Sequence, residues 1–187
     1  MTGLCLVRHG QTDWNQEGRY QGQSDVPLNE AGRAQARRLA KELKEYPFVA
    51  VYSSDLMRAR ETAGSIAATL NRPGTLETRL REINQGGWEG ELVENIMAGY
   101  GEAWKQRKVD PASFRPPGGE TVAEVARRVY AALDDIARLH PGATVLIVSH
   151  GLVMATAICK VHGTPLGQAF SVIPNNADPV WLDWNVK

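Results

Sequence analysis

The sequence predicts an α/β fold, a three-layer α/β/α sandwich with a mainly parallel central sheet. Short apolar runs of strand length alternate with longer segments whose apolar residues recur at helical spacing. Most of the connections between them are short, which favours parallel strands covered by helices on both faces. The chain has 187 residues, enough for one domain with a full core, and no linker composition interrupts it. We therefore expect a single domain over residues 1–187.

The N-terminal part of the chain predicts a strand, a loop and a helix. Thr2–Val7 is an apolar run that we expect to form a buried strand, and the polar stretch 11–25 should be a loop. Asn29 is a suitable N-cap for the helix that follows, and Pro47 stops that helix. The buried face of this helix repeats at i, i+3, i+4 and i+7 through Ala36, Leu39, Ala40 and Leu43.

A second strand and helix follow. Phe48–Tyr52 is rich in residues that favour sheet and stops at Ser53 and Ser54, which we expect to be turn and cap residues because no base is evident beside them. The stretch 76–83 predicts either a short strand or a loop. The next helix has an inner stripe formed by Ala59, Ala63, Ile66, Ala67 and Leu70.

The middle of the chain departs from this alternation. Glu91–Trp104 predicts a weakly amphipathic helix, and Asp110–Gly119 is a loop rich in proline and glycine. A long excursion of this kind in a compact domain is often a binding loop, so we expect a lid-like insertion at about residues 91–119. The aromatic residues nearby either face a substrate or pack in the core: Trp88, Trp104 and Phe114.

The C-terminal third returns to helices and strands. Thr121 and Glu124 form a capping box, and the helix they open has an inner face of Val122, Val125, Ala126, Val129, Leu133, Ile136 and Leu139. Thr144–Val148 is the most hydrophobic predicted strand, and a helix begins directly after it and runs to about Val161. Val180–Trp184 should be a last strand at an edge of the sheet.

Composition limits the classes of partner and compartment. Lys and Arg together number 21, as do Asp and Glu, so no overall charge favours nucleic acid or an anionic membrane. Cys5 and Cys159 both lie in apolar surroundings and have no disulfide or metal spacing, which indicates free thiols in a reducing compartment. The sequence has no signal-peptide pattern and no apolar stretch of membrane-spanning length. We therefore expect a cytoplasmic protein.

Three predicted strands end in residues suited to an anion. The first ends in Arg8 and His9, the second is followed by Arg58 one turn into the next helix, and the third ends beside His150. In a parallel sheet these ends lie on the same side, where two helix N-termini would also direct free N–H groups. A single histidine at a strand end is usually structural, but three convergent ends indicate a phosphate site. Nothing in the sequence resembles a Walker loop, and no aspartate cluster suggests a di-metal site.

Five blocks of sequence, in order along nearly the whole chain, carry a family resemblance. They are Leu6–Asn15, Ser53–Ala63, Arg81–Ile83 with Gly87–Gly90, Pro117–Thr121 and Ser149–Gly151. Together they resemble the signature of the histidine phosphatase superfamily, in the branch of the cofactor-dependent phosphoglycerate mutases. The resemblance implies a phosphoglycerate mutase-like fold.

The resemblance also implies a role for each matching residue. It makes His9 the phosphate acceptor, His150 the second pocket histidine, and Arg8 and Arg58 the residues that hold the phosphate. His9 must then be neutral at the attacking nitrogen, which a hydrogen bond from its other nitrogen to a backbone carbonyl would achieve. Further substrate-binding positions implied by the resemblance are Asn15, Gln21, Gly22 and Gly151.

The same resemblance makes Glu82 the proton donor to the leaving alkoxide. From the residues alone Glu82 could be a surface carboxylate, and Glu89 or Glu120 could be the acid in its place. A carboxylic acid in this role would next act as the base that activates water against phosphohistidine.

We predict a metal-independent and cofactor-independent phosphatase that hydrolyses small phosphorylated metabolites through a phosphohistidine on His9. The short chain favours this activity over a mutase, and the stretch 110–120 is similar to α-ribazole phosphatase-like and broad-specificity members of the family. Substrate identity should depend on residues 91–116. The alternatives are phosphoryl transfer of the phosphoglycerate mutase type and a non-catalytic phospho-ligand binder. The last strand could pair in a homodimer.

Overall fold

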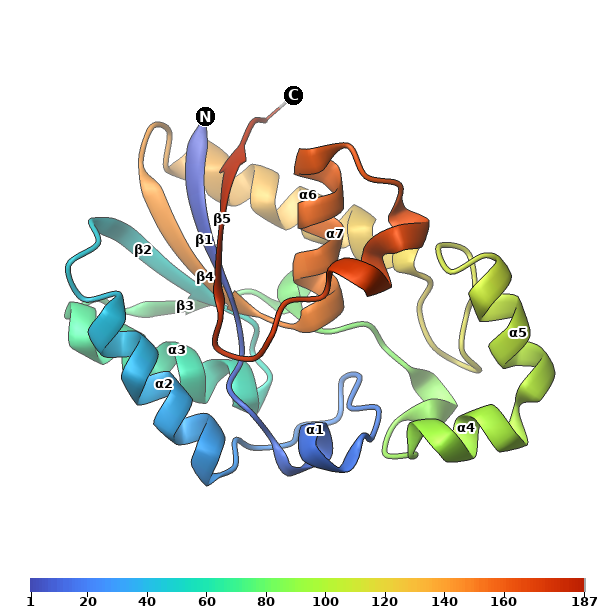
Figure 1. Cartoon of the computed structure of the whole chain (residues 1–187). Helices are drawn as coiled ribbons and strands as arrows, with labels where there is room; N and C mark the ends of the chain where they lie inside the picture. Colours follow the sequence, from blue (N-terminus) through green and yellow to red (C-terminus); the bar gives the residue numbers. More distant parts are fainter. Residues whose placement is uncertain (187) are drawn as a thin grey trace.

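A five-stranded sheet lies at the centre of the computed structural model, which describes residues 1–186 (Figure 1). The strand order is β3-β2-β4-β1-β5. Every neighbouring pair is parallel except β1 with β5, which is antiparallel and places β5 at one edge, as predicted. The strands are β1 (Thr2–Arg8), β2 (Phe48–Ser53), β3 (Gly74–Leu76), β4 (Thr144–Ser149) and β5 (Pro179–Trp184).

Helices cover both faces of this sheet (Figure 1). They are α2 (Glu30–Glu42) and α3 (Met57–Leu70) on one face, and α6 (Val122–Leu139) and α7 (Gly151–His162) on the other. Alternate residues of β1 point to opposite faces, so Leu4 and Leu6 pack against α6 and α7 while Cys5 and Val7 pack against α2 and α3. All four side chains are buried. The predicted three-layer architecture is therefore confirmed.

The predicted helix starts are confirmed at α2 and α6. The Asn29 side chain accepts a hydrogen bond from the Gly32 N–H at 2.8 Å, and Thr121 and Glu124 form the capping box in both directions. The predicted inward position of Leu139 is wrong, because this side chain is 69% exposed. Leu139 is the last residue of α6, and its side chain is not part of the buried face of the helix, which ends at Ala137.

Two predicted segments differ from the structure. Residues 11–25 are not all loop, since Asp13–Glu17 forms the short helix α1, stabilised by a capping box between Thr12 and Asn15. The predicted helix 91–104 is two helices, α4 (Val93–Gly99) and α5 (Gly101–Val109), which are separated at Tyr100. Both differences arise in polar or weakly amphipathic sequence, where hydrophobic periodicity is least informative.

Short 3₁₀ helices account for most of the remaining differences. The ambiguous stretch 76–83 contains the end of β3 and then the 3₁₀ helix Thr78–Leu80. Two further 3₁₀ helices, at Gly86–Trp88 and Leu166–Val172, were not predicted. No helix within residues 1–186 is both long enough and apolar enough to cross a bilayer. Cys5 and Cys159 are both free and buried.

Candidate active site

The carboxyl ends of β1 and β4 bring the two predicted histidines together. The parallel register places Arg8 opposite Ser149, so that His9 and His150 both leave the sheet at the same level. The His9 N–H donates to the Ser149 carbonyl at 3.0 Å and extends this pairing by one residue. The two imidazole centroids are 5.2 Å apart. Neighbouring parallel strands thus fix the spacing of the two rings.

A cavity of about 290 Å³ opens at this end of the sheet. Its wall contains segments that are far apart in sequence, including the loop after β1, the first turn of α3, the start of α7 and part of α5. Eight of the nine predicted site residues line it: Arg8, His9, Asn15, Gln21, Gly22, Arg58, Glu82 and Gly151. The ninth, His150, lies behind the wall next to His9 and is wholly buried.

The His9 ring is held in one tautomer. Nδ1 lies 2.7 Å from the Gly10 carbonyl oxygen, which can only accept, so Nδ1 carries the proton. Nε2 accepts from the Arg58 Nε at 3.3 Å, consistent with a free lone pair there. Burial, together with the charges of Arg58 and Arg8, holds the pKa of His9 well below its ordinary value of 6.5. His9 is therefore neutral at physiological pH, with a nucleophilic nitrogen on its cavity side.

Two guanidinium groups, one fully buried (Arg58) and one partly buried (Arg8), flank this nitrogen. Arg58 is fully buried and donates to the carbonyls of Gly22 at 2.7 Å and Ser24 at 2.8 Å. Burial lowers its pKa to about 10, although the negative charge of Glu82 opposes the shift. Arg8 donates to the Pro174 carbonyl at 2.8 Å, and its Nε has no partner among residues 1–186. Neither arginine pairs with a carboxylate of the described chain, so the pair can neutralise a bound dianion.

His150 contributes a second, unpartnered imidazole. Both of its ring nitrogens are buried and lack a hydrogen-bond partner within residues 1–186. Burial and the neighbouring positive charges hold its pKa well below the usual value. His150 also occupies the N-cap position of α7, where free N–H groups of the helix point toward the site. A polar group so deeply buried without a partner is expected to be satisfied by a ligand.

Glu82 lies in the cavity wall and reaches the N-terminus of α7. Its Oε1 accepts a hydrogen bond from the Ile83 N–H at 2.9 Å, and its Oε2 accepts one from the Leu152 N–H at 3.2 Å. Of the three acids considered from sequence, only Glu82 lines the cavity. Glu89 accepts hydrogen bonds from Gln23 and Ser24, and Glu120 forms an ion pair with a neighbouring arginine. The geometry therefore favours Glu82 as the acid.

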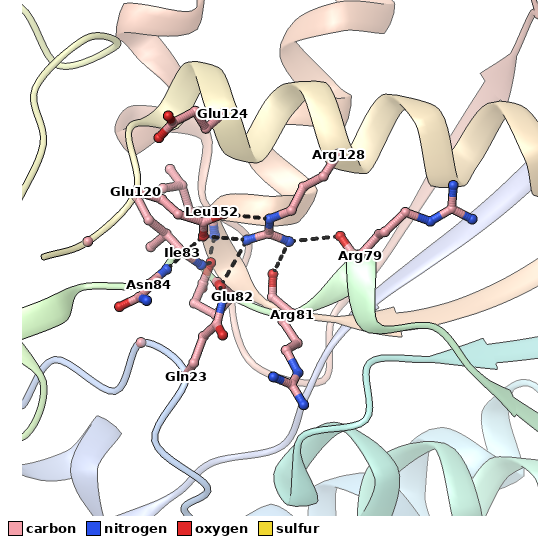
Figure 2. A network of polar contacts seen from close by, with 12 residues as sticks. Gln23, Arg79, Arg81, Glu82, Ile83, Asn84, Glu120, Glu124, Arg128 and Leu152 are labelled. Carbon is pink, nitrogen blue, oxygen red and sulfur yellow. Dashed lines mark hydrogen bonds and ion pairs between the residues drawn. The ribbon is translucent and has the colours of Figure 1, made fainter.

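Arg128 on α6 holds the backbone that carries Glu82 (Figure 2). Its guanidinium group donates to the carbonyls of Arg79, Arg81 and Glu82 at distances of 2.6 to 3.0 Å. It also forms an ion pair with Glu120, whose carboxylate accepts from Nε at 3.0 Å and from Nη2 at 2.9 Å. A single side chain thus connects α6 to the loop that ends at the proposed acid.

The remaining predicted residues shape the cavity through backbone and amide groups. Asn15 accepts from the Thr12 N–H in the capping box of α1, and the Oε1 of Gln21 is buried without a partner in the described chain. Gly22 has a φ of +51°, and its missing Cβ leaves space that the Glu89 carboxylate occupies. At Gly151 a Cβ would lie 2.8 Å from a methyl group of Ile173.

The structure shows whether the three aromatic residues line the cavity or pack away from it, and it places in the cavity wall two residues that the sequence analysis did not identify. Trp88 is fully buried and stacks on Phe114 with centroids 5.4 Å apart, and the ring centroid of Trp104 lies 6.2 Å from that of Trp88. None of these three lines the cavity. Arg107 of α5 and Phe170 of the last 3₁₀ helix do line it, and neither was predicted. Only the general assignment of specificity to residues 91–116 pointed toward Arg107.

No group of three or more His, Cys, Asp or Glu side chains suited to a metal ion occurs within residues 1–186. The positive charge at the site comes from arginines.

Comparisons with known proteins place the chain among phosphatases and mutases. The model of the histidine phosphatase superfamily (branch 1) matches residues 4–187. The chain is 38% identical over 177 residues to phosphoserine phosphatase 1 of Hydrogenobacter thermophilus, covering 95% of this chain and 84% of that one. It is also 38% identical over 166 residues to a probable phosphoglycerate mutase, GpmB, of Escherichia coli, covering 88% of this chain and 77% of the relative.

A solved structure agrees with this relationship. The structure of Bacillus stearothermophilus YhfR superposes with a TM-score of 0.90 at 36% identity, covering 99% of this chain and 92% of that chain. The predicted phosphoglycerate mutase-like fold is thereby confirmed.

Proposed function

The chain belongs to branch 1 of the histidine phosphatase superfamily, and from this membership we propose that it is a phosphoric monoester hydrolase acting on small phosphorylated metabolites. The observation that carries the proposal is the environment of His9. A neutral imidazole, with its proton fixed on Nδ1, presents Nε2 beside the buried Arg58 and the partly buried Arg8, neither of which has a carboxylate partner within residues 1–186. This arrangement suits nucleophilic attack on a phosphate dianion.

In the first proposed step, His9 Nε2 forms a bond to phosphorus while the bond from phosphorus to the ester oxygen breaks. The charge on the three other phosphoryl oxygens is stabilised by Arg8, Arg58 and the N–H groups at the start of α7. His150 adds an N–H donor next to His9. Glu82 gives its proton to the departing oxygen, so the alcohol leaves neutral.

In the second step, Glu82 takes a proton from water, and the water oxygen displaces the imidazole from phosphorus. Inorganic phosphate leaves, and His9 returns to its neutral form. The arginines supply the positive charge throughout, and the proposed reaction uses no metal ion or other cofactor.

The decisive experiment combines His9→Ala with detection of the phosphoenzyme. Wild-type protein mixed with p-nitrophenyl phosphate and quenched in alkali should carry one base-stable, acid-labile phosphoryl group. His9→Ala should carry none and should lose turnover while it keeps its circular dichroism spectrum. His162→Ala, which alters an exposed histidine at the end of α7, is the matched control and should retain both properties. Turnover that survives in folded His9→Ala would exclude the phosphohistidine.

The main alternative is phosphoryl transfer of the mutase type, favoured by the similarity to a probable phosphoglycerate mutase. A time course with 3-phosphoglycerate, with and without a bisphosphoglycerate primer, separates the two activities. Release of inorganic phosphate supports the hydrolase, and formation of the isomer without free phosphate supports the mutase. A protein that hydrolyses none of a panel of phosphomonoesters at any pH would be a phospho-ligand binder.

The proposal places the enzyme in the cytoplasm, where buried free thiols such as those of Cys5 and Cys159 remain reduced. Pairing of β5 in a homodimer and closure of residues 91–119 as a lid remain predictions.

A further inference from the structure

One charged residue in the cavity wall has no part in the proposed reaction. Arg107 comes from α5, in the segment that the strand–helix alternation does not explain, and its guanidinium group is stacked among aromatic rings. The guanidinium carbon lies 4.1 Å from the ring centroid of Phe170 and 4.7 Å from that of Trp104. The Tyr20 ring is 5.9 Å away. Rings from three separate segments thus hold a planar cation at the cavity.

Arg107 differs from the other arginines of the wall because its N–H groups are unused. Arg19 pairs with Glu17 and donates to the Gly90 carbonyl, and Arg8 and Arg58 are placed around His9. Arg107 has neither a hydrogen bond nor an ion pair with any residue in the range 1–186. Burial lowers its pKa, as expected for a cation that lacks a compensating anion.

The surroundings limit what the cation can bind. The cavity wall near this segment includes Val93, Phe170 and Ile173, so the organic part of a ligand would contact apolar side chains there. A phosphate dianion at His9 is balanced by two arginines, whereas Arg107 is a single positive charge and matches a monoanion. The guanidinium edge fits a carboxylate, which it can bind through two parallel hydrogen bonds.

We propose that Arg107 binds a carboxylate on the organic part of the substrate, so that the enzyme selects phosphomonoesters that also carry a carboxylate. This inference rests on the proposed phosphatase function and names its substrate class. Arg107 is a specificity residue that acts remotely from the reacting phosphorus, and its effect is on recognition rather than on the chemical step.

The test uses two substrates that differ only in the anionic group. 3-Phosphoglycerate has a carboxylate where glycerol 3-phosphate has a hydroxymethyl group. Wild-type enzyme should favour 3-phosphoglycerate by about 10- to 100-fold in kcat/KM, the range expected for one charge-assisted contact. Arg107→Met should bring that ratio close to one by raising KM for 3-phosphoglycerate. The kcat/KM values for glycerol 3-phosphate and p-nitrophenyl phosphate should change less than about 3-fold, and so should the inhibition constant for inorganic phosphate. Arg107 does not touch the reacting phosphate in this proposal.

Lys108→Met is the matched control, because it removes the same charge from an exposed neighbouring position on α5 and should leave the ratio unchanged. Arg107→Lys, which keeps the charge without the planar fork, should give an intermediate ratio and covers the case in which the Met variant does not fold.

Each outcome decides between the two proposals. Hydrolysis of p-nitrophenyl phosphate with no wild-type preference for the carboxylate, or a preference that Arg107→Met retains, overturns the assignment of Arg107 and leaves the phosphatase function standing. A larger preference for 2,3-bisphosphoglycerate over 3-phosphoglycerate, lost in Arg107→Met, would show that the group bound is a second phosphate and would also overturn it. If none of the substrates is hydrolysed, the proposed phosphatase function is refuted, and so is this inference.

Discussion

Replacement of Arg128 by Met should destabilise the fold near the proposed acid. The substitution keeps most of the aliphatic packing but removes a guanidinium group that donates to three backbone carbonyls and to Glu120. The two charged side chains are only 19% and 23% exposed, so water replaces the lost bonds incompletely. A fully buried pair broken on one side costs about 3–5 kcal/mol, and partial exposure reduces this to about 3 kcal/mol.

Urea unfolding followed by circular dichroism measures this loss, together with a fall in Tm of about 6–12 °C for a chain of this size. Arg138→Met is the matched control, since Arg138 lies on the same helix, has a side chain that is 56% exposed and, within residues 1–186, pairs only with Asp135 at 2.9 Å. The control should lose less than about 0.5 kcal/mol. A loss below about 1 kcal/mol for Arg128→Met, or one equal to the control, would refute the idea that this residue holds the loop of Glu82 in place.

Further predictions concern the acid, the buried histidines and the backbone. Glu82→Gln should lower kcat/KM for alkyl phosphates more than for p-nitrophenyl phosphate, whose phenolate needs no proton, and equal losses in kcat/KM would contradict the acid role. The pKa of His150 is lower in the folded state than in the unfolded state, so the unfolded state binds a proton that the folded state does not. The free energy of unfolding therefore decreases as the pH is lowered below about 6.5. From pH 7.5 to 5.5 urea unfolding should show a loss of about 1.4 kcal/mol from this residue that is absent in His150→Asn. Gly22→Ala should cost about 2 kcal/mol or more, because φ is positive and the Glu89 carboxylate fills the space; an unchanged urea midpoint would be inconsistent with this. Dialysis against EDTA should leave phosphatase activity intact, and a loss restored by a divalent ion would contradict the proposed chemistry.

The grouping of residues beside His9 could be predicted because these residues follow the ends of predicted strands. Arg8 and His9 follow an apolar run, and His150 follows another, so parallel pairing alone brings them to one edge. The main error in this region was α1, because its four polar residues and one tryptophan give no hydrophobic period and only the Thr12–Asn15 capping box indicates the helix.

The specificity side of the cavity could not be predicted in the same way. The position of Arg107 in the cavity wall depends on Tyr20, Trp104 and Phe170, whose rings surround its guanidinium group only in the folded chain. The helix that carries it, α5, is separated from α4 at Tyr100 and has apolar residues on no single face, so sequence periodicity does not indicate its orientation. Leu139 shows the related difficulty that helical spacing can include an apolar residue at the end of a helix whose side chain is exposed.

The hydrogen bond from His9 to the carbonyl of Gly10 has a stereochemical consequence. Because the acceptor belongs to the next residue of the same chain, we expect the imidazole plane to keep the same orientation in the substrate complex and in the proposed phosphorylated form. The alcohol must then depart, and water must arrive, through the same opening opposite the ring. Each in-line displacement inverts the configuration at phosphorus. A substrate made chiral at phosphorus with sulfur and oxygen isotopes should therefore yield thiophosphate of unchanged handedness.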